Sequence, residues 1–227
     1  MKKRLGIVFA GGDGPEPETL RRLLEGSAPD SGGALTAAAD SGLLLAEAAG
    51  IRPDWVVGDM DSLDDENRLR FYPKDRIARH PADKDFTDTE LALDLLWENG
   101  CGDLWIIGGG GGRIAHVFAV RDVFERERFP VRWITAGEDI RCVDGSAGDG
   151  TWGGFSPGPE AGDVVSVFPL GDGPWKVESR GLKWPLDGVR WKRGLYGFGN
   201  VALGRDTGIR ALRGRFMIVL ERVCRQQ

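Results

Sequence analysis

The sequence predicts an α/β protein: an N-terminal, mostly parallel sheet flanked by helices, plus a smaller C-terminal antiparallel β-sandwich domain. Up to about residue 137, short apolar runs alternate with helical patterns, as buried parallel strands and their crossover helices do. Beyond that point, short runs are split by Gly, Asp, Ser and Pro, which is typical of antiparallel strands joined by turns. We therefore expect an α/β nucleotide-binding domain over residues 1–140 and a β-sandwich domain over residues 141–227.

The expected strands of the first domain are short apolar runs bounded by turn residues. They are Leu5–Ala10, Leu35–Ala39, Trp55–Val57, Arg76–Ala78, Leu104–Ile107 and Val131–Thr135. The expected helices are Glu16–Leu24, Gly42–Ala49, a segment from Thr87 to Asn99, and one that follows Arg113. Thr87 and Glu90 have the spacing of a capping box, which marks the start of a helix.

The second domain is expected to consist of five short strands. They are Val164–Pro169, Trp175–Ser179, Gly181–Pro185, Val201–Leu203 and Phe216–Val223. The segment from 136 to 162 is rich in turn residues, and we place the domain boundary between about 137 and 160.

Composition narrows the class of protein. With 227 residues, 41% hydrophobic and 29% charged, the chain has the composition of a globular protein. Its net charge of -5 argues against a nucleic-acid partner, and no apolar run reaches the ~20 residues that cross a membrane. Cys101, Cys142 and Cys224 are odd in number and form no CxxC pair, which predicts reduced thiols and a cytoplasmic location.

Acidic residues follow two of the predicted strands. Asp40 comes directly after Leu35–Ala39, and Asp59 and Asp61 come directly after Trp55–Val57. The carboxyl ends of parallel strands meet at one edge of a sheet, where ligands bind, so these side chains are expected to face one crevice. The alternative for each one is a structural role as the cap of the next helix.

The segment Lys84-Asp85-Phe86-Thr87-Asp88 adds further carboxylates before the third helix. Mg²⁺ is usually held by one or two carboxylates plus substrate phosphates, so acidic clusters on adjacent loops fit a magnesium polyphosphate. Lys84 either contacts a phosphate or neutralises its acidic neighbours.

The glycine run Gly108–Gly112 follows a strand and precedes a helix, with Arg113 directly after it. Glycines at such a junction let backbone amides approach phosphate oxygens, and Arg113 adds donors. The run matches neither of the common glycine-rich nucleotide motifs, and a tight turn for helix packing is the alternative reading. His116, nearby, is either a catalytic residue or an ordinary helix histidine.

Taken in order, five segments resemble the thiamine pyrophosphokinase family, also called thiamine diphosphokinase. They are ADSG at 39–42, PDWVVGDMDS at 53–62, KDFTD at 84–88, GGGGGRIAH at 108–116 and GLKWPL at 181–186. The resemblance implies an α/β domain followed by a β-sandwich, in a homodimer with active sites at the subunit interface. It also implies an enzyme that transfers pyrophosphate from ATP to the hydroxyl of thiamine and releases AMP, with Mg²⁺ as the cofactor.

The resemblance also assigns roles to residues of this sequence. Asp59, Asp61 and Asp85 are expected to form the metal site and, with Arg113, the catalytic group. The residues expected to bind the nucleotide are Asp40, Lys84, Gly111, Gly112, Arg113 and His116. The residues expected to bind thiamine are Thr87, Asp88, Trp184 and Asn200, with the Trp184 indole supplied by the partner subunit. Without the motif, Trp184 reads as one of eight tryptophans that fill a core.

Two positions depart from the family pattern. Ala115 stands where the family usually has an acidic residue, and Gly199 precedes Asn200 where the family usually has Ser. Two other functions therefore stay open: a pyrophosphokinase for another heterocyclic alcohol, such as a pterin, and a non-catalytic nucleotide or thiamine sensor. An NAD-dependent oxidoreductase ranks last, because hydride transfer gives the acidic clusters no role.

Overall fold

The computed structural model describes residues 4–25, 33–61, 66–145 and 158–222. The chain divides into two compact units, Met1–Ala136 and Gly137–Gln227. The boundary expected after residue 140 falls inside a strand, β7 (Glu138–Asp144), so the second unit begins slightly earlier than the sequence suggested.

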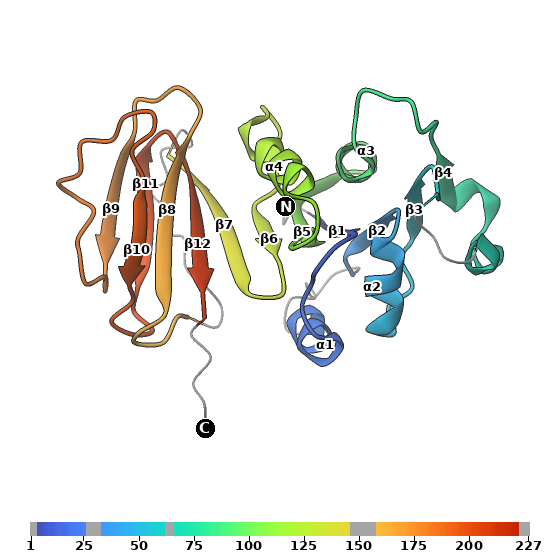
Figure 1. The fold of residues 1–227 in the computed structure, drawn as a ribbon, viewed down its shortest axis with the longest axis horizontal. Helices are drawn as coiled ribbons and strands as arrows, with labels where there is room; N and C mark the ends of the chain where they lie inside the picture. The colour runs from blue at the N-terminus through green and yellow to red at the C-terminus, as the bar shows by residue number, and fades with distance from the viewer. Residues whose placement is uncertain (1–3, 26–32, 62–65, 146–157, 223–227) are drawn as a thin grey trace. The chain divides into compact units, whose positions relative to one another are not determined.

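The first unit contains a sheet of parallel strands, as predicted (Figure 1). The strands are β1 (Arg4–Ala10), β2 (Leu35–Ala39), β3 (Trp55–Gly58), β4 (Ile77–Arg79), β5 (Cys101–Gly108) and β6 (Arg132–Ile134). Their spatial order is β6-β5-β1-β2-β3-β4. The central strand β1 is buried from Leu5 to Ala10, because helices cover both faces of the sheet there.

Helices lie on both faces of this sheet. In Figure 1, α1 (Pro17–Glu25) and α2 (Gly42–Ala48) lie on one face, and α3 (Asp88–Glu98) and α4 (Ile114–Asp122) lie on the other. Three short 3-10 helices complete the unit: η1 (Glu66–Phe71), η2 (Lys74–Arg76) and η3 (Val123–Glu125). The capping box predicted at Thr87 is confirmed, because Thr87 Oγ1 accepts from the Glu90 amide while the Glu90 carboxylate accepts from the Thr87 amide.

The chain changes direction across the sheet between β1 and β5. It runs outward from β1 through β2 and β3 to β4, and then returns to the other side of β1 with β5 and β6. The carboxyl ends of β1 and β5 therefore form a topological switch point, the place where open α/β sheets bind ligands. The loops after these two strands meet there. The Asp13 amide donates to the Gly110 carbonyl, and the Gly110 amide donates to the Asp13 carbonyl.

The second unit is a small antiparallel β-sandwich, as predicted. One sheet has the order β10-β8-β12-β7 and the other pairs β11 with β9. The strands beyond β7 are β8 (Val164–Leu170), β9 (Lys176–Arg180), β10 (Gly197–Val201), β11 (Gly208–Arg213) and β12 (Arg215–Glu221). Buried side chains of both sheets form one core, among them Val167 and Phe216 from the first sheet and Val177 and Ile209 from the second.

The predicted strand Gly181–Pro185 is wrong. This segment contains no strand and holds only an isolated bridge between Leu182 and Ala202. The amide and carbonyl of Trp184 form hydrogen bonds with the side chain of Asn200 instead of with the backbone of a neighbouring strand. Of the run predicted at Val201–Leu203, only Val201 lies in a strand, as the last residue of β10. The strands β7 and β11 were not predicted.

Two residues of the predicted motifs, Ser62 and Cys224, lie outside the described residues. In the part of the chain that the structure describes, no helix combines the length and the apolar character needed to cross a bilayer.

Candidate functional site

A cavity of about 520 Å³ opens at the carboxyl edge of the parallel sheet. Its walls come from the loops after β1, β2, β3 and β5, from the segment before α3, and from the start of α4. Polar side chains and glycines make up most of the lining. The cavity therefore lies at the switch point where the strand order predicts a ligand site.

Three carboxylates converge on one side of this cavity. Asp40, Asp59 and Asp88 each offer an oxygen, and these oxygens all lie within 4.8 Å of one another. Asp40 follows β2, Asp59 follows β3 and Asp88 is the first residue of α3. The residues are far apart in the sequence, and the parallel sheet brings them together because the ends of β2 and β3 are neighbours.

Two residues with unusual backbone angles set these carboxylates in place. Asp40 has a φ of 50° and Met60 a φ of 69°, and they are the non-glycine residues with left-handed φ in the described part of the chain. The Met60 side chain is buried in the core beneath the sheet edge, which turns Asp59 and Asp61 outward on either side of it. Left-handed non-glycine residues cost free energy and cluster at functional sites, where the surrounding structure enforces them.

Lys84 supplies the positive charge beside the acidic group. Its Nζ lies 3.1 Å from Asp88 Oδ1 and 3.8 Å from Asp59 Oδ2, and it donates to the carbonyl of Pro81 at 3.0 Å. Its side chain is only 14% exposed. One ammonium against three carboxylates leaves a net double negative charge, which suits a divalent cation with a preference for oxygen ligands.

The Asp59 carboxylate is held in its charged form. Its Oδ1 accepts a hydrogen bond of 3.1 Å from the Asp61 amide. This backbone hydrogen bond is the main cause that lowers the pKa of Asp59, and the charge of Lys84 lowers the pKa further. Asp59 is therefore ionised at neutral pH, as a metal ligand must be.

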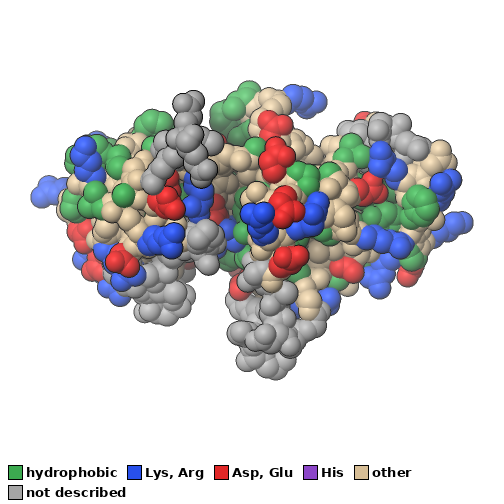
Figure 2. Space-filling view, turned by 90° about the horizontal axis from the view of Figure 1, so that it is seen from below, with side chains coloured by type: hydrophobic (Ala, Val, Ile, Leu, Met, Phe, Trp, Pro, Cys, Tyr) green, Lys and Arg blue, Asp and Glu red, His purple; other side chains and the backbone are tan. Residues whose placement is uncertain are grey.

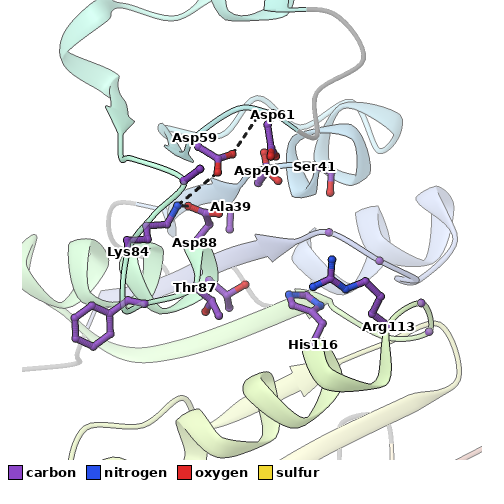
Figure 3. Close-up of a pocket in the computed structure, with 17 residues that line it drawn as sticks. Ala39, Asp40, Ser41, Asp59, Asp61, Lys84, Thr87, Asp88, Arg113 and His116 are labelled. Carbon is purple, nitrogen blue, oxygen red and sulfur yellow. Dashed lines mark hydrogen bonds and ion pairs between the residues drawn. The ribbon is translucent and has the colours of Figure 1, made fainter.

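The opposite side of the cavity is basic. Gly111, Gly112, Arg113 and His116 line it from the glycine-rich loop after β5 and from the start of α4. Figure 3 shows the side chains of Arg113 and His116 next to each other, across the cavity from Asp40, Asp59 and Asp61. No carboxylate of the described residues pairs with the exposed Arg113 guanidinium, which leaves its donors open to a ligand.

The glycine run has backbone angles that favour glycine, with positive φ at Gly108, Gly109, Gly111 and Gly112. Gly111 has a φ of 60°, and a Cβ built on it would lie 2.0 Å from the Asp13 carboxylate, so no larger residue fits without a shift. Arg113 is the N-cap residue of α4 and forms no side-chain cap there, since its side chain has no acceptor. The amides of the first turn of α4 thus receive no side-chain cap from Arg113, and such amides favour phosphate.

The structure brings most of the predicted site residues into this one cavity. Its lining includes Asp40, Asp59, Asp61, Lys84, Thr87, Asp88, Gly111, Gly112, Arg113 and His116. Two of these differ in detail from expectation: Asp88, expected to contact thiamine, lies in the carboxylate cluster, and the Thr87 hydroxyl is engaged with Glu90.

Asp85 does not lie where the metal-site prediction put it. It is exposed and is not part of the cavity lining. The carboxylate cluster contains Asp40 and Asp88 in place of Asp61 and Asp85, although Asp61 does line the cavity. The cause is local. Thr87 is fixed as the N-cap of α3, and this sets Asp88 on the first turn facing Asp59 while Asp85 stays in the exposed segment before the cap.

Trp184 and Asn200 lie in the second unit. Asn200 is buried and clamps Trp184: its Oδ1 accepts from the Trp184 amide at 3.1 Å and its Nδ2 donates to the Trp184 carbonyl at 2.6 Å. The Trp184 side chain is 53% exposed, so the core-filling alternative is wrong for this tryptophan. Asn200 thus positions the backbone of Trp184, and both the oxygen and the nitrogen of its side-chain amide are used in these two hydrogen bonds.

Sequence reasoning missed several residues of the cavity. Gly11 and Gly12 line it from the loop after β1, and Phe86 lines it with 51% of its surface exposed. Gly12 has a φ of 108°, and a Cβ there would lie 2.6 Å from the Gly110 carbonyl oxygen. Adjacent glycines directly after the first predicted strand were the available signal for this loop.

Comparisons with known proteins agree with this geometry. Residues 31–130 match the family model described as thiamin pyrophosphokinase, catalytic domain. The fold is similar to that of thiamine pyrophosphokinase from Bacillus subtilis, with a TM-score of 0.73, 21% identity, and coverage of 98% of this chain and 100% of that one. No curated protein matches the sequence.

Two further solved structures share the fold. A thiamin pyrophosphokinase family protein from Enterococcus faecalis matches with a TM-score of 0.71, 22% identity, and coverage of 97% of this chain and 100% of that one. Yeast thiamin pyrophosphokinase matches with a TM-score of 0.65, 15% identity, and coverage of 97% and 87%.

The parallel sheet, with the acidic cluster and the glycine loop at one switch point, defines the first unit as an α/β domain with a candidate ligand site. The match over residues 31–130 is more specific. This match confirms the resemblance to the thiamin pyrophosphokinase family seen in the sequence.

Proposed function

We propose that the protein transfers the pyrophosphoryl group of ATP to the hydroxyl of thiamine, giving thiamine diphosphate and AMP. The observation that carries the proposal is the convergence of Asp40, Asp59 and Asp88 beside Lys84, across one cavity from Arg113. A cavity with carboxylates on one wall and cationic donors on the other suits a triphosphate bound with a divalent cation. The family of the domain supports the acceptor.

The donor set fits Mg²⁺. Asp40, Asp59 and Asp88 would hold the ion, because their oxygens are hard ligands and they outnumber the single nearby ammonium. When bound, Mg²⁺ neutralises charge on the triphosphate. The side chains and backbone amides of the two walls then bind phosphate oxygens and accept the hydroxyl proton.

On the basic wall, Arg113 and the backbone amides of Gly111 and Gly112 bind and orient phosphate oxygens. The thiamine hydroxyl oxygen attacks the β-phosphorus, and the bond from that phosphorus to the α–β bridging oxygen breaks. AMP leaves with that oxygen, and a carboxylate of the acidic wall takes the hydroxyl proton. Orientation and electrostatic stabilisation supply most of the rate enhancement in such transfers.

Trp184 is proposed to act from a second copy of the chain. Asn200 holds the backbone of Trp184, and the indole, which is 53% exposed, offers a face for a flat cation such as thiamine. This part of the proposal requires a homodimer. A single copy in solution with full activity would contradict it.

The test is direct. Purified protein is incubated with thiamine, ATP and Mg²⁺, and thiamine diphosphate and AMP are quantified by chromatography. We expect equal amounts of both products, and EDTA should abolish them. Ligand-induced thermal stabilisation without AMP would refute catalysis and favour a sensor. AMP formed only with another acceptor, such as a hydroxymethyl pterin, would refute thiamine as the substrate.

Variants separate the proposed metal ligands from their neighbours. Asp59→Asn and Asp88→Asn should each lower turnover by roughly a hundredfold or more, since each removes a charge that serves the transition state. Asp85→Asn should retain most activity, because Asp85 is exposed outside the cavity lining. Asp75→Asn, an exposed residue on η2, is the matched control. Loss of activity in Asp85→Asn with retention in Asp88→Asn would overturn the structural assignment.

A further inference from the structure

A second cavity lies in the first unit, away from the sheet edge described above. It has a volume of about 320 Å³ and is lined by Glu47, Gly50, Ile51, Arg52, Phe71 and Tyr72. These residues come from the C-terminal end of α2, the turn that leads into β3, and the end of η1. The first cavity meets the other end of α2, at Ser41, so the two cavities lie at opposite ends of this helix.

Exposed aromatic surface is the first notable feature of the second cavity. Phe71 is 58% exposed, although a phenyl ring is normally buried. Tyr72 next to it is buried and presents only part of its ring. With Ile51, these side chains make an apolar wall. An uncovered ring in a concave site is a common platform for a flat ligand.

Guanidinium groups lie over both rings. The Arg52 Cζ lies 5.1 Å from the centroid of the Tyr72 ring, and the Arg70 Cζ lies 4.8 Å from the centroid of the Phe71 ring. Both arginines are exposed, and neither pairs with a carboxylate of the described residues. A guanidinium that stacks on a ring keeps its N–H donors at its edge, where they can bind an anion.

The lining holds one acidic and one basic residue, Glu47 and Arg52, and a second guanidinium, that of Arg70, stacks on the lining residue Phe71. The acidic residue, Glu47, is already paired with Arg68. Burial, followed by the charge of Glu47, raises the pKa of Tyr72, so its hydroxyl remains a hydrogen-bond donor. Figure 2 shows Lys and Arg side chains gathered at the right-hand end of the view, the end that carries β4 in Figure 1. This surface stands out in a chain whose net charge is -5.

We propose that this second cavity binds a small aromatic anion, with the ring against Phe71 and Ile51 and the anionic group on Arg52 and Arg70. The volume is at the lower end of the ~300–1,000 Å³ typical of ligand sites, which fits a single ring and excludes a dinucleotide.

Phenyl phosphate is a suitable probe, with inorganic phosphate as the control for charge and benzyl alcohol as the control for the ring. Isothermal titration calorimetry on the full-length protein should detect phenyl phosphate more tightly than either control. Arg52→Gln and Phe71→Ala should each weaken binding roughly tenfold, because each removes one of the two recognition elements.

Two further variants serve as controls. Arg128→Gln also removes a guanidinium from above a ring, that of Trp97 at 5.2 Å, but lies outside the cavity, so binding should not change. Arg113→Gln removes the phosphate donors of the first cavity, so the titration is repeated in this variant, and Arg52→Gln should weaken the binding that remains. Phe71 is exposed, so Phe71→Ala should fold normally, and equal unfolding temperatures for all variants would establish this.

Several outcomes would overturn the proposal. They are the absence of measurable binding at millimolar phenyl phosphate, loss of binding in Arg113→Gln with retention in Arg52→Gln, or equal affinity for inorganic phosphate. The assay measures binding and not turnover. Failure of the pyrophosphokinase assay would therefore leave this inference standing, and failure of this inference would leave the pyrophosphokinase proposal standing.

Discussion

The acidic cluster should destabilise the fold when no cation is bound, and Asp40→Asn tests this. Two unit charges 4.8 Å apart repel by about 3.5 kcal/mol at an effective dielectric constant near 20. Asp40 faces two such neighbours, Asp59 and Asp88, but Lys84 offsets part of the repulsion. After relaxation, we expect Asp40→Asn to raise the free energy of unfolding by about 1–2 kcal/mol.

The assay is thermal and urea denaturation of the protein in EDTA, with and without added salt. A gain of this size corresponds to a higher melting temperature by roughly 2–8 °C. Asn also tolerates the left-handed φ of 50° at this position. Salt separates the two causes: the gain from relieved repulsion should shrink in 1 M NaCl, and the gain from the backbone should not.

Addition of Mg²⁺ should reverse the ranking. A ligand that binds only the native state stabilises it in proportion to its affinity, and the wild-type protein with three carboxylates should gain more than Asp40→Asn. Asp75→Asn, which removes an exposed charge elsewhere, should change neither measurement. If Asp40→Asn is no more stable than the wild-type protein in EDTA, the three side chains do not repel one another as the structure indicates.

Three other predictions concern local structure. Thr87→Ala should lower the free energy of unfolding by about 1 kcal/mol in urea denaturation because it removes the cap of α3, whereas Thr87→Ser should not; equal stability of the two variants would contradict the capping box. Burial raises the pKa of Cys101, so the native state keeps the thiol proton to a higher pH than the unfolded state does. The free energy of unfolding should therefore fall as the pH rises above the ordinary thiol pKa of 9.0. Cys101→Ala should lack this part of the fall. Asn200→Ala should cost about 1–3 kcal/mol, since it leaves the amide and carbonyl of Trp184 without their partners, and acrylamide should then quench tryptophan fluorescence more strongly.

The parts of the fold that depend on local chemistry could be predicted from the sequence. The bounds of β2 match the apolar run Leu35–Ala39, and the capping box at Thr87 follows from side chains three residues apart. Such features need only the period of apolar residues and the reach of a side chain. Parallel pairing then follows from the alternation of strands and helices.

The strand β7 could not be predicted, because its sequence Glu138–Asp144 carries alternating charges in the midst of turn residues. In the structure, Arg141 Nε lies 3.1 Å from Asp139 Oδ1, and Asp144 pairs with Arg215 of β12. These ion pairs neutralise the charges within the sheet. The pairing with β12 exists only after residues more than 70 positions apart have met, and no local pattern encodes it.

Which carboxylates form the cluster also depends on contacts between segments that are far apart in the sequence. The sequence places Asp85 and Asp88 in one short segment, and nothing in their spacing says which one faces Asp59. The answer comes from the position of α3 relative to β3, which turns Asp88 toward the cavity and leaves Asp85 exposed. The chain thus predicts that carboxylates gather at this edge, whereas packing selects the members of the cluster.

The position of Lys84 connects the acidic cluster to its proposed chemistry. The sequence left two roles open, contact with phosphate or neutralisation of acidic neighbours, and the structure places Nζ 3.1 Å from Asp88 Oδ1. A cation among the carboxylates would compete with that ammonium for the same oxygens, and the long flexible stem of a lysine lets the ammonium shift without moving the backbone. A phosphate oxygen that arrives with the cation offers the displaced ammonium a new partner. Under the proposed function, we therefore expect Lys84 to neutralise its acidic neighbours first and to contact phosphate once the nucleotide is bound.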